Sequence, residues 1–317
     1  MDCFLSKKIL EMIFFYDDFF LEKKNVVAVG LGSKIIKNMD TKEPCLKVFV
    51  EKKVPINKLL KNELLPKEIF GMKIDVIEVG KTPSFLTYPS DKVSSDNKFQ
   101  TSNRFQTRLR PIEPACSISQ YKNMSAGTLG AIVFDNETNE PYILSNNHVL
   151  VNQDEPKKQM AILQPGHKYG GSSNLNIIAM GTRYIPIKTT DYNLVDCAVT
   201  KILPHVNYLK RIFIIGEISG IADAKENEEV VKVGATSQYT EGKVIATNVS
   251  LSVLSSHKVK LSYKNQIAVS RMSEDGDSGS IYLNYKTKAI GLGFCATDTT
   301  TFLNPIFSVL ASLNVHF

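Results

Sequence analysis

Three short segments, far apart in the chain, carry the residue types that a nucleophilic hydrolase needs. His148 lies in Ser-Asn-Asn-His-Val, Asp196 in Asp-Cys-Ala-Val and Ser278 in Gly-Asp-Ser-Gly. A serine hydroxyl becomes a good nucleophile when a histidine removes its proton, and that histidine needs a carboxylate to hold its tautomer. The three side chains therefore predict a catalytic triad, with Ser278 as nucleophile, His148 as base and Asp196 as orienting group. Asp196 is preferred over Asp191 because apolar residues flank it on both sides, and a carboxylate there needs a partner such as an imidazole.

The glycine before Asp277 predicts a binding site for a negatively charged oxygen. Such an oxygen is stabilised by backbone N–H groups, and a glycine lets the backbone turn into the conformation that aims them. The N–H groups of Gly276 and Ser278 are the expected donors of this oxyanion hole.

The order of the three residues resembles that of the trypsin-like serine proteases, which have the chymotrypsin fold. His148, Asp196 and Ser278 follow one another at intervals of 48 and 82 residues, in the chymotrypsin-like order. The histidine segment is similar to that of HtrA-type bacterial proteases, and Gly-Asp-Ser-Gly matches the nucleophile turn of animal trypsins. The resemblance implies a mainly β protein, a chymotrypsin-like double β-barrel, with His148 and Asp196 on one barrel and Ser278 on the other.

A wider set of segments resembles a group of bacterial proteins that are similar to the plant narrow-leaf-type trypsin-like proteases. These segments are Val26–Gly32, Gly127–Ala131, Leu163–Gly166, Asn193–Asp196 and Asn304–Ile306. The resemblance covers about residues 25–317. It implies the fold and the triad, suggests that the chain forms homo-oligomers, and leaves the substrate open.

The same resemblance implies roles for residues near the nucleophile. Asp277 is expected to support the oxyanion turn and not to act as the base. Met272, six positions before the serine, is expected at the base of the primary substrate pocket, and the expected wall residues are Gly291, Gly293 and Phe294. Since methionine cannot pair with a basic side chain, a medium-sized apolar residue is the expected preference at the cleaved position.

The amino-acid composition indicates which general classes of protein are compatible with this sequence. The 317 residues are 43% apolar and 22% charged, which is ordinary for a globular protein with two cores. The net charge of +6 lies in the leading third: residues 1–110 hold 20 Lys and Arg against 14 Asp and Glu, and residues 111–317 hold 18 of each. This excess could dock an acidic partner or a nucleic acid. A solvated lysine-rich face is favoured, because no basic run alternates with aromatic residues, so no nucleic-acid partner is expected.

The number and spacing of the cysteines and histidines indicate the cellular compartment of the protein and whether it binds a metal or another cofactor. The five cysteines are odd in number and scattered, without a Cys-x-x-Cys pair, which favours a reducing, cytoplasmic location. The remaining histidines form no metal-binding spacing, so neither a metal nor another cofactor is expected. Acidic residues interrupt the N-terminal apolar residues, and no run approaches the ~20 apolar residues that span a membrane, so no signal peptide and no membrane contact are expected.

Four regions are expected along the chain. Residues 1–24 read as an amphipathic helix with an apolar stripe of Phe4, Leu5, Ile9, Met12, Ile13, Tyr16 and Phe20. Residues 25–80 read as a small α+β module and residues 81–110 as a polar linker. Residues 111–317 read as the protease domain, with expected strands that include Pro141–Leu150 in the first barrel and Phe213–Ile218 in the second. Asn304 is expected to cap a closing helix over Ile306–Leu313.

Two functions remain from these patterns. The favoured one is a serine endopeptidase acting on a protein or peptide substrate through an acyl-enzyme on Ser278, regulated or oligomerised through its N-terminal module. The alternative is a latent or non-catalytic peptide-binding or scaffold protein on a protease fold. An intact set of His148, Asp196 and Ser278 favours the enzyme.

Overall fold

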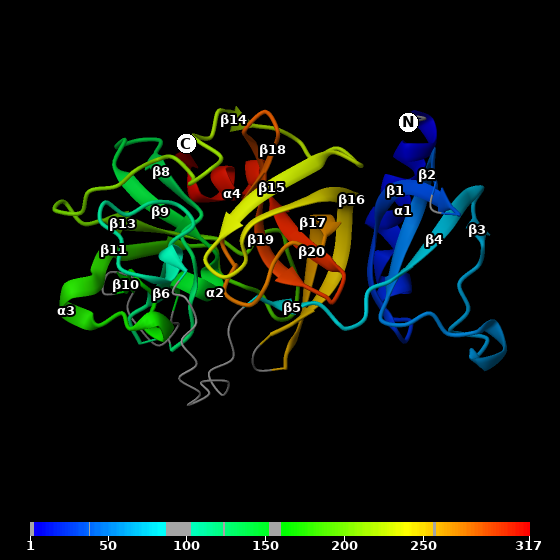
Figure 1. The fold of residues 1–317 in the computed structure, drawn as a ribbon. Helices are drawn as coiled ribbons and strands as arrows, with labels where there is room; N and C mark the ends of the chain where they lie inside the picture. Colours follow the sequence, from blue (N-terminus) through cyan, green and yellow to red (C-terminus); the bar gives the residue numbers. More distant parts are fainter. Residues whose placement is uncertain (1–2, 38, 87–102, 123, 152–159, 256–257) are drawn as a thin grey trace.

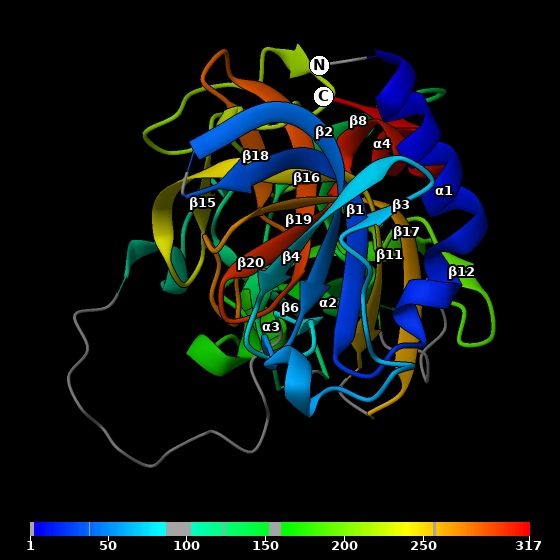
Figure 2. The same ribbon diagram turned by 90° about the vertical axis from the view of Figure 1, so that its right-hand side faces the viewer.

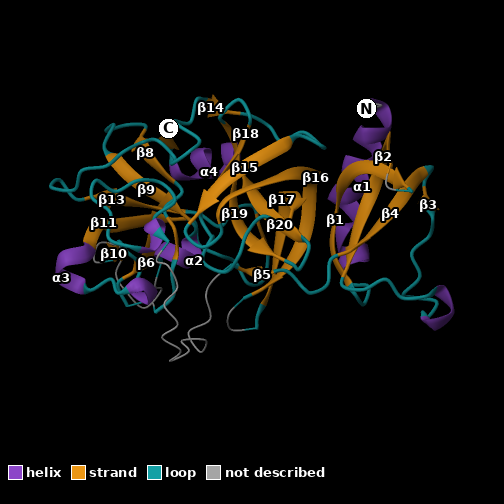
Figure 3. Ribbon diagram, viewed as in Figure 1, coloured by secondary structure: helices purple, strands orange, loops and turns teal. Residues whose placement is uncertain are grey.

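The computed structural model describes residues 3–37, 39–86, 103–122, 124–151, 160–255 and 258–317. Strands dominate it, and nearly all of them belong to two sheets (Figures 1 and 3). In Figure 1 the first sheet lies at the left, the yellow to red strands of the second lie in the middle, and the blue N-terminal strands extend the second sheet to the right.

The first sheet has eight strands in the order β21-β8-β9-β13-β11-β10-β6-β7. Its neighbouring strands are antiparallel, and short connections join β8 to β9 and β6 to β7. The strands are β6 (Ser117–Gln120), β7 (Gly127–Thr128), β8 (Ala131–Asp135), β9 (Pro141–Ser145), β10 (Ala161–Leu163), β11 (Ile177–Tyr184), β13 (Ala198–Ile202) and β21 (Val315–His316).

The second sheet contains a closed ring of six strands. The ring runs β17-β20-β19-β18-β15-β16 and closes where β16 pairs with β17. Closure removes the exposed edges that an open sheet would have. The ring strands are β15 (Glu229–Gly234), β16 (Gln238–Leu254), β17 (Lys260–Ser270), β18 (Ile281–Asn284), β19 (Lys288–Ala296) and β20 (Thr300–Pro305).

One apolar cluster joins the two halves. It takes Val133 and Leu144 from the first sheet, Val231 and Leu283 from the ring, and apolar residues of the closing helix α4 (Ile306–Leu313). A further link is β12 (Tyr192–Asn193), which pairs with β17 although the chain then continues into β13 of the first sheet. The segment that carries Asp196 therefore crosses from one half to the other.

The N-terminal region is hydrogen-bonded to the ring. Strand β1 (Val26–Ile36) pairs with β16 on one side and with β2 (Met39–Val50) on the other, and β4 (Met72–Glu78) and β3 (Glu68–Ile69) follow outward. Helix α1 (Cys3–Leu21) runs alongside these strands (Figure 2) and buries Ile9, Met12 and Phe20 against them. Phe4 and Tyr16, expected in that apolar stripe, are instead exposed.

The remaining elements are short. They are β5 (Ser84–Phe85), which pairs with β16 and β19, β14 (Gly220–Ile221), α2 (Asn147–Leu150), α3 (Ser173–Asn176), and the 3₁₀ turns Ile56–Lys58, Arg104–Gln106 and His167–Tyr169. No helix among the described residues is both long and apolar enough to cross a membrane.

The expected fold class is confirmed: the protein is mainly β, with the two-barrel arrangement of the chymotrypsin-like fold and a small N-terminal α+β unit. Two expected strands differ. Residues 213–218 form no strand, because the N–H of Gly216 bonds to the carbonyl of Ile212 at 2.8 Å and closes a tight turn. The strand expected over residues 141–150 ends at Ser145, and the single turn of α2 follows it.

The expected linker also differs at both of its ends. At its start, Ser84 and Phe85 form β5 within the second sheet. At its end, Asn103 donates to the carbonyl of Ala235 at 2.9 Å, and Arg104 pairs with Glu113 at 2.5 Å. Residues 87–102 of this linker lie outside the described residues.

Candidate active site

His148 lies in α2, directly after β9 of the first sheet. Its Nδ1 faces the Oδ2 of Asp196, and its backbone N–H donates to the Oδ1 of the same carboxylate at 3.2 Å. With the carboxylate at Nδ1, the proton resides there and Nε2 is left as the acceptor. The side chain of Asp196 is fully buried, so the imidazole is the polar partner that burial of this carboxylate requires.

The other ring nitrogen of His148 faces Ser278. Nε2 lies 2.8 Å from the Oγ of Ser278, on the turn that precedes β18. A carboxylate, an imidazole and a hydroxyl from three distant segments thus form one continuous line of hydrogen bonds. That geometry suits transfer of the serine proton to Nε2. The structure therefore brings together the three residues singled out in the sequence.

Asp191, the rejected alternative, lies elsewhere. Its exposed carboxylate pairs with Lys188 at 2.9 Å, and this contact lowers the pKa of Asp191. Cys197 and Cys295 are both buried, and burial raises the pKa of each thiol well above its usual value. Neither thiol is therefore suited to replace Ser278 as nucleophile.

Three buried amide side chains hold the segment of Asp196, and no local sequence pattern predicts this role for them. Asn304 Oδ1 accepts the backbone N–H of Asp196 at 2.9 Å, and Asn304 Nδ2 donates to Gln266 at 2.6 Å. Gln266 in turn donates to the carbonyl of Leu194 at 2.8 Å, and Asn146 donates to the carbonyl of Asp196 at 2.7 Å. Asn304 thus lies in β20 and does not cap α4, because its amide is used by the Asp196 segment.

The turn before Ser278 has the backbone conformation expected from its glycine. Gly276 has φ +101°, in a region that other residues rarely adopt, and an added Cβ would collide with Thr236 Oγ1. The hydroxyl of Thr128, from the first sheet, donates to the carbonyl of Gly276 at 2.9 Å. The N–H of Gly276, one of the two expected oxyanion donors, belongs to the preceding peptide unit, whose carbonyl on Asp275 accepts the hydroxyl of Thr236 at 2.9 Å.

Asp277 is the centre of a buried hydrogen-bond cluster that shapes this turn. Its Oδ1 accepts the backbone N–H of Thr236 at 2.9 Å, and its Oδ2 accepts that of Glu274 at 2.9 Å. Its Oδ2 also lies 3.0 Å from the ammonium of Lys232, and both side chains are fully buried. The expectation that Asp277 supports the turn fits these contacts, but nothing in the sequence singled out Lys232 as its partner.

The pKa values of this pair reflect burial and attraction together. Burial is the largest influence on Lys232 and lowers its pKa, although Asp277 opposes the effect. For Asp277, burial raises the pKa, but the charge of Lys232 and the hydrogen bonds outweigh it and hold the pKa below its usual value. Each group therefore favours the charged form of the other, while burial opposes the charge on both.

The residues expected to form the substrate pocket lie mostly in the interior of the ring. Met272 is buried among Val244, Tyr282 and Leu303. A Cβ on Gly291 would lie 2.8 Å from Leu303, and one on Gly293 would lie 2.8 Å from the ring of Tyr282, so both glycines allow close strand packing. The ring of Phe294 packs on Tyr263, with centroids 4.9 Å apart. Their backbone does approach the site: the carbonyl of Phe294 lies 3.4 Å from the Oγ of Ser278, and the carbonyl of Gly293 accepts the N–H of Gly279 at 2.9 Å.

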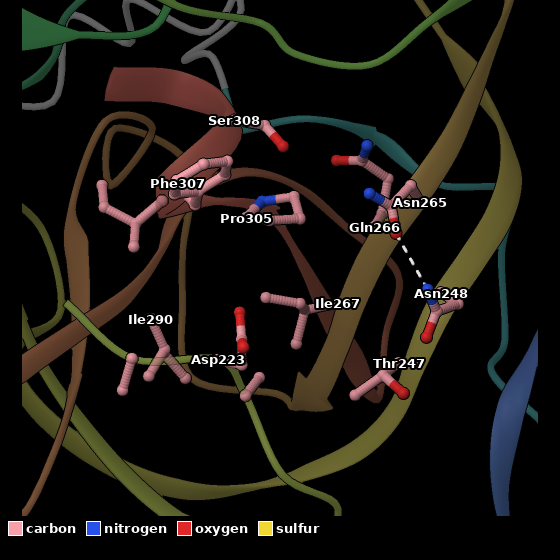
Figure 4. A pocket seen from close by; sticks show the side chains of 13 residues that line it. Asp223, Thr247, Asn248, Asn265, Gln266, Ile267, Ile290, Pro305, Phe307 and Ser308 are labelled. Atoms are coloured by element: carbon pink, nitrogen blue, oxygen red, sulfur yellow. Dashed lines mark hydrogen bonds between the residues drawn. The ribbon is translucent and has the colours of Figure 1, made fainter. Parts of the chain in front are cut away.

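A recess lies beside the support of Asp196 rather than beside the triad (Figure 4). It has a volume of about 270 Å³, and Gln266, Ile267, Pro305 and Phe307 are among the residues that line it. The dashed line in Figure 4 is the 3.0 Å hydrogen bond between Asn248 and Asn265 at its rim. None of His148, Asp196 and Ser278 lines this recess.

The chain matches no family model, and no curated protein matches it. Solved structures that resemble it are serine proteases. One is a glutamic-acid-specific serine protease that uses a histidine triad in substrate binding, with 16% identity, a TM-score of 0.47, and coverage of 64% of this chain and 98% of that chain. Others are the Nocardiopsis protease (16%, TM-score 0.44, 65% and 97%) and the Cellulomonas bogoriensis chymotrypsin (16%, TM-score 0.44, 66% and 98%). At these values the likeness assigns no residue and no substrate, so the site is interpreted from its own geometry.

Proposed function

We propose that the protein is a serine endopeptidase that hydrolyses peptide bonds through an acyl-enzyme on Ser278. One observation carries the proposal: the line of contacts from Asp196 through His148 to the Oγ of Ser278, with 2.8 Å between Nε2 and Oγ. Each group is in the position that general-base activation of a hydroxyl requires.

The reaction follows from these positions. His148 Nε2 takes the proton of Ser278 as Oγ attacks a substrate carbonyl, and the N–H groups of Gly276 and Ser278 stabilise the oxyanion. His148 then gives the proton to the leaving amine. Water repeats the sequence on the ester and restores the serine. Asp196 stays ionised and stabilises the imidazolium that forms in each step.

Lys232 supports the further proposal that the site needs no newly cut N-terminus to become active. In trypsin-type activation, a freed N-terminus pairs with the Asp before the nucleophile. Here the ammonium of Lys232 already pairs with Asp277 at 3.0 Å in the intact chain. The carboxylate of Asp277 therefore already has a positively charged partner in the uncut chain.

The substrate is proposed to be a protein or peptide with a medium-sized apolar residue at the cleaved position. This preference keeps the expectation drawn from Met272, which carries no charge that could pair with a Lys or Arg side chain, although its own side chain is packed inside the ring. We also propose that the protein is related to the bacterial narrow-leaf-type proteases, that it is cytoplasmic, and that it forms oligomers through its N-terminal module.

A latent protein is the second candidate, and a specific contact favours it. The N–H of Gly276, which a substrate oxyanion would need, donates at 2.7 Å to the carbonyl of Leu86 in the same chain. The site is thus occupied from within, so an enzyme of this kind would need the occupant to leave before it acts on other proteins.

The proposal is tested by hydrolysis of casein and of a peptide ester. The Ser278→Ala variant should lose at least about a thousandfold in rate, since triad members act as a unit, and should keep the circular dichroism spectrum of the parent. Ser219→Ala is the matched control and should leave the rate unchanged, because the hydroxyl of this exposed serine donates to the carbonyl of Lys286 at 2.8 Å and is not part of the site. Undiminished hydrolysis by Ser278→Ala would exclude the assignment.

A further inference from the structure

Residues 84–86 enter the candidate site as an added strand. β5 pairs antiparallel with β19, with Phe85 opposite Cys295 and Ser84 opposite Ala296. The N–H of Leu86 continues this ladder and donates to the carbonyl of Phe294 at 3.2 Å. Extended peptides bind to sheet edges in this way, by main-chain hydrogen bonds. The segment therefore has the backbone geometry of a bound peptide.

The carbonyl of Leu86 lies at the reacting groups. It accepts the N–H of Gly276 at 2.7 Å, and Gly276 is one of the two expected oxyanion donors. The Phe294 carbonyl that receives the N–H of Leu86 is itself 3.4 Å from the Oγ of Ser278. Both polar groups of Leu86 are thus bound to the backbone that flanks the nucleophile.

The two neighbouring side chains fit the same arrangement. The ring of Phe85 stacks on the imidazole of His148, with centroids 4.4 Å apart and planes at 18°. The side chain of Leu86 is 2% exposed, although it belongs to none of the apolar clusters of the described residues. The backbone of Leu86 is held between β19 and the turn that precedes Ser278.

Contacts on both sides of residues 84–86 hold this segment in position. The carbonyl of Val79 accepts the N–H of Asp298 at 3.0 Å, and the carbonyl of Pro83 accepts that of Leu254 at 2.8 Å. Asn103, on the far side of the residues that the structure leaves out, is bonded to Ala235, next to Thr236, whose hydroxyl donates to Asp275 at 2.9 Å. Both flanks are therefore anchored close to the turn that carries Ser278.

We propose that the protein cleaves its own chain at the peptide bond after Leu86. The inference rests on the proposed peptidase activity and names its first substrate. Ser278 Oγ attacks the carbonyl carbon of Leu86 while His148 takes its proton, and the carbon–nitrogen bond to residue 87 breaks as that nitrogen receives the proton. Water then cleaves the ester, its proton passing through His148 to the serine. One water is consumed, and the products are a carboxylate on Leu86 and a new amino terminus on residue 87.

Cleavage after Leu86 also implies a way in which the activity toward other substrates is regulated. The fragment that ends at Leu86 keeps its β1–β16 ladder and the packing of α1, so it stays bound after the cut. Residues 84–86 then remain in the site as a bound product. Other substrates are cleaved only when this segment leaves.

The test follows the full chain by intact mass and N-terminal sequencing at neutral pH. We expect the wild type to convert to two fragments, with a new terminus at residue 87, at a rate independent of protein concentration. The fragments should co-elute under native conditions and separate in denaturant. Ser278→Ala should stay whole. Leu86→Lys should also stay whole, because burying a lysine there removes the water that solvates its charge, and should hydrolyse a peptide ester at least about fivefold faster than the parent. Leu60→Lys, at an exposed leucine of the same region, should behave as the wild type.

The outcomes separate this inference from the function on which it rests. If wild type or Leu86→Lys hydrolyses the ester in a Ser278-dependent way while the wild-type chain stays whole after Leu86, self-cleavage is wrong and the peptidase stands. If Leu86→Lys keeps its thermal transition and neither protein hydrolyses the ester or cuts itself, both proposals fail. Cleavage elsewhere, or cleavage whose rate rises with protein concentration, also overturns the inference. Should Leu86→Lys not fold, the wild type and Ser278→Ala decide by themselves.

Discussion

The ammonium of Lys232 lies 3.0 Å from the carboxylate of Asp277, and both side chains are fully buried. It also donates to the hydroxyl of Ser237, which belongs to the same cluster. Removing one member of a buried pair leaves an uncompensated charge and typically costs 3–5 kcal/mol. Because the remaining charge here sits in the turn that carries the oxyanion donor, the cost falls on the active conformation.

Lys232→Met should therefore lower kcat/KM by at least about 100-fold, equivalent to ~2.7 kcal/mol of transition-state stabilisation. The measurement is steady-state hydrolysis of a peptide ester, with thermal unfolding recorded in parallel. Lys243→Met is the matched control, since Lys243 forms an exposed pair with Glu229. Full activity in Lys232→Met would show that the pair does not shape the turn.

The lowered pKa of Lys232 also gives a pH dependence. Burial lowers this pKa from 10.5, so the ammonium loses its proton at a lower pH than an exposed lysine does. The charged pair is complete below that pH and is lost as pH rises through it. Activity should accordingly fall on the alkaline side, with a midpoint below 10.5 that depends on Lys232. In Lys232→Arg the guanidinium stays charged, so the midpoint should move upward; an unmoved alkaline limb would assign it to another group.

At the scale of elements, the position of Asp196 depends on strands that lie outside its own half. Asn304 on β20 and Gln266 on β17 belong to the ring, and together they bond to the backbone of Asp196 and Leu194. The ring therefore holds the orienting carboxylate as well as the nucleophile, while the first sheet supplies His148.

Asn304→Ala should leave the buried N–H of Asp196 without its acceptor. Such a loss costs about 1–3 kcal/mol, and for a chain of this size each kcal/mol lowers the melting temperature by about 2–4 °C. We also expect kcat to fall by about tenfold, because Asp196 is no longer fixed against His148. Calorimetry and ester kinetics measure both effects. Asn248→Ala, at the rim of the neighbouring recess, should change neither, and a similar loss in that variant would indicate a general packing effect.

Features that depend on a local sequence pattern were predictable, and features that depend on pairing between distant strands were not. Gly-Asp-Ser-Gly and the histidine segment are local patterns with few other uses, so the meeting of His148, Asp196 and Ser278 was predictable. Lys232, Gln266 and Asn304 act through pairings between strands that are distant in sequence, and their residue types have many other uses. The apolar run Phe213–Ile218 predicts a strand, whereas Gly216 closes a turn there. The polar composition around Leu86 predicts a linker, because the backbone partners of Leu86 lie more than 180 residues away and leave no local signal.

At the scale of the whole molecule, the N-terminal region is a continuation of the second sheet. β1 pairs directly with β16, and the ammonium of Lys264 on β17 pairs with Asp17 of α1 at 3.0 Å. Helix α1 is therefore linked to the ring by hydrogen-bonded strands and by this ion pair. The same region leads, through residues 79–86, into the site itself.

The outer face of α1 exposes Phe4, Phe14, Phe15 and Phe19, which are 52–72% exposed. Aromatic side chains gathered on one face are typical of protein interfaces, and we expect them to join a second copy of the chain. Phe14→Lys combined with Phe15→Lys should convert the oligomer to a monomer in sedimentation experiments, without loss of the thermal transition. Phe307→Lys, at an exposed aromatic on α4, is the control. A monomeric wild type would contradict this interface.

The central claim is that His148 activates Ser278 as a nucleophile, and a fluorophosphonate probe tests it most directly, because its reaction needs both groups. Wild type and Leu86→Lys are incubated with the probe, and the modified peptide is identified by mass spectrometry. We predict one adduct, on Ser278, that forms faster in Leu86→Lys, is absent in Ser278→Ala and is at least about a hundredfold slower in His148→Ala. No adduct on Ser278 in either the wild type or a folded Leu86→Lys, or equal labelling in His148→Ala, would contradict the claim.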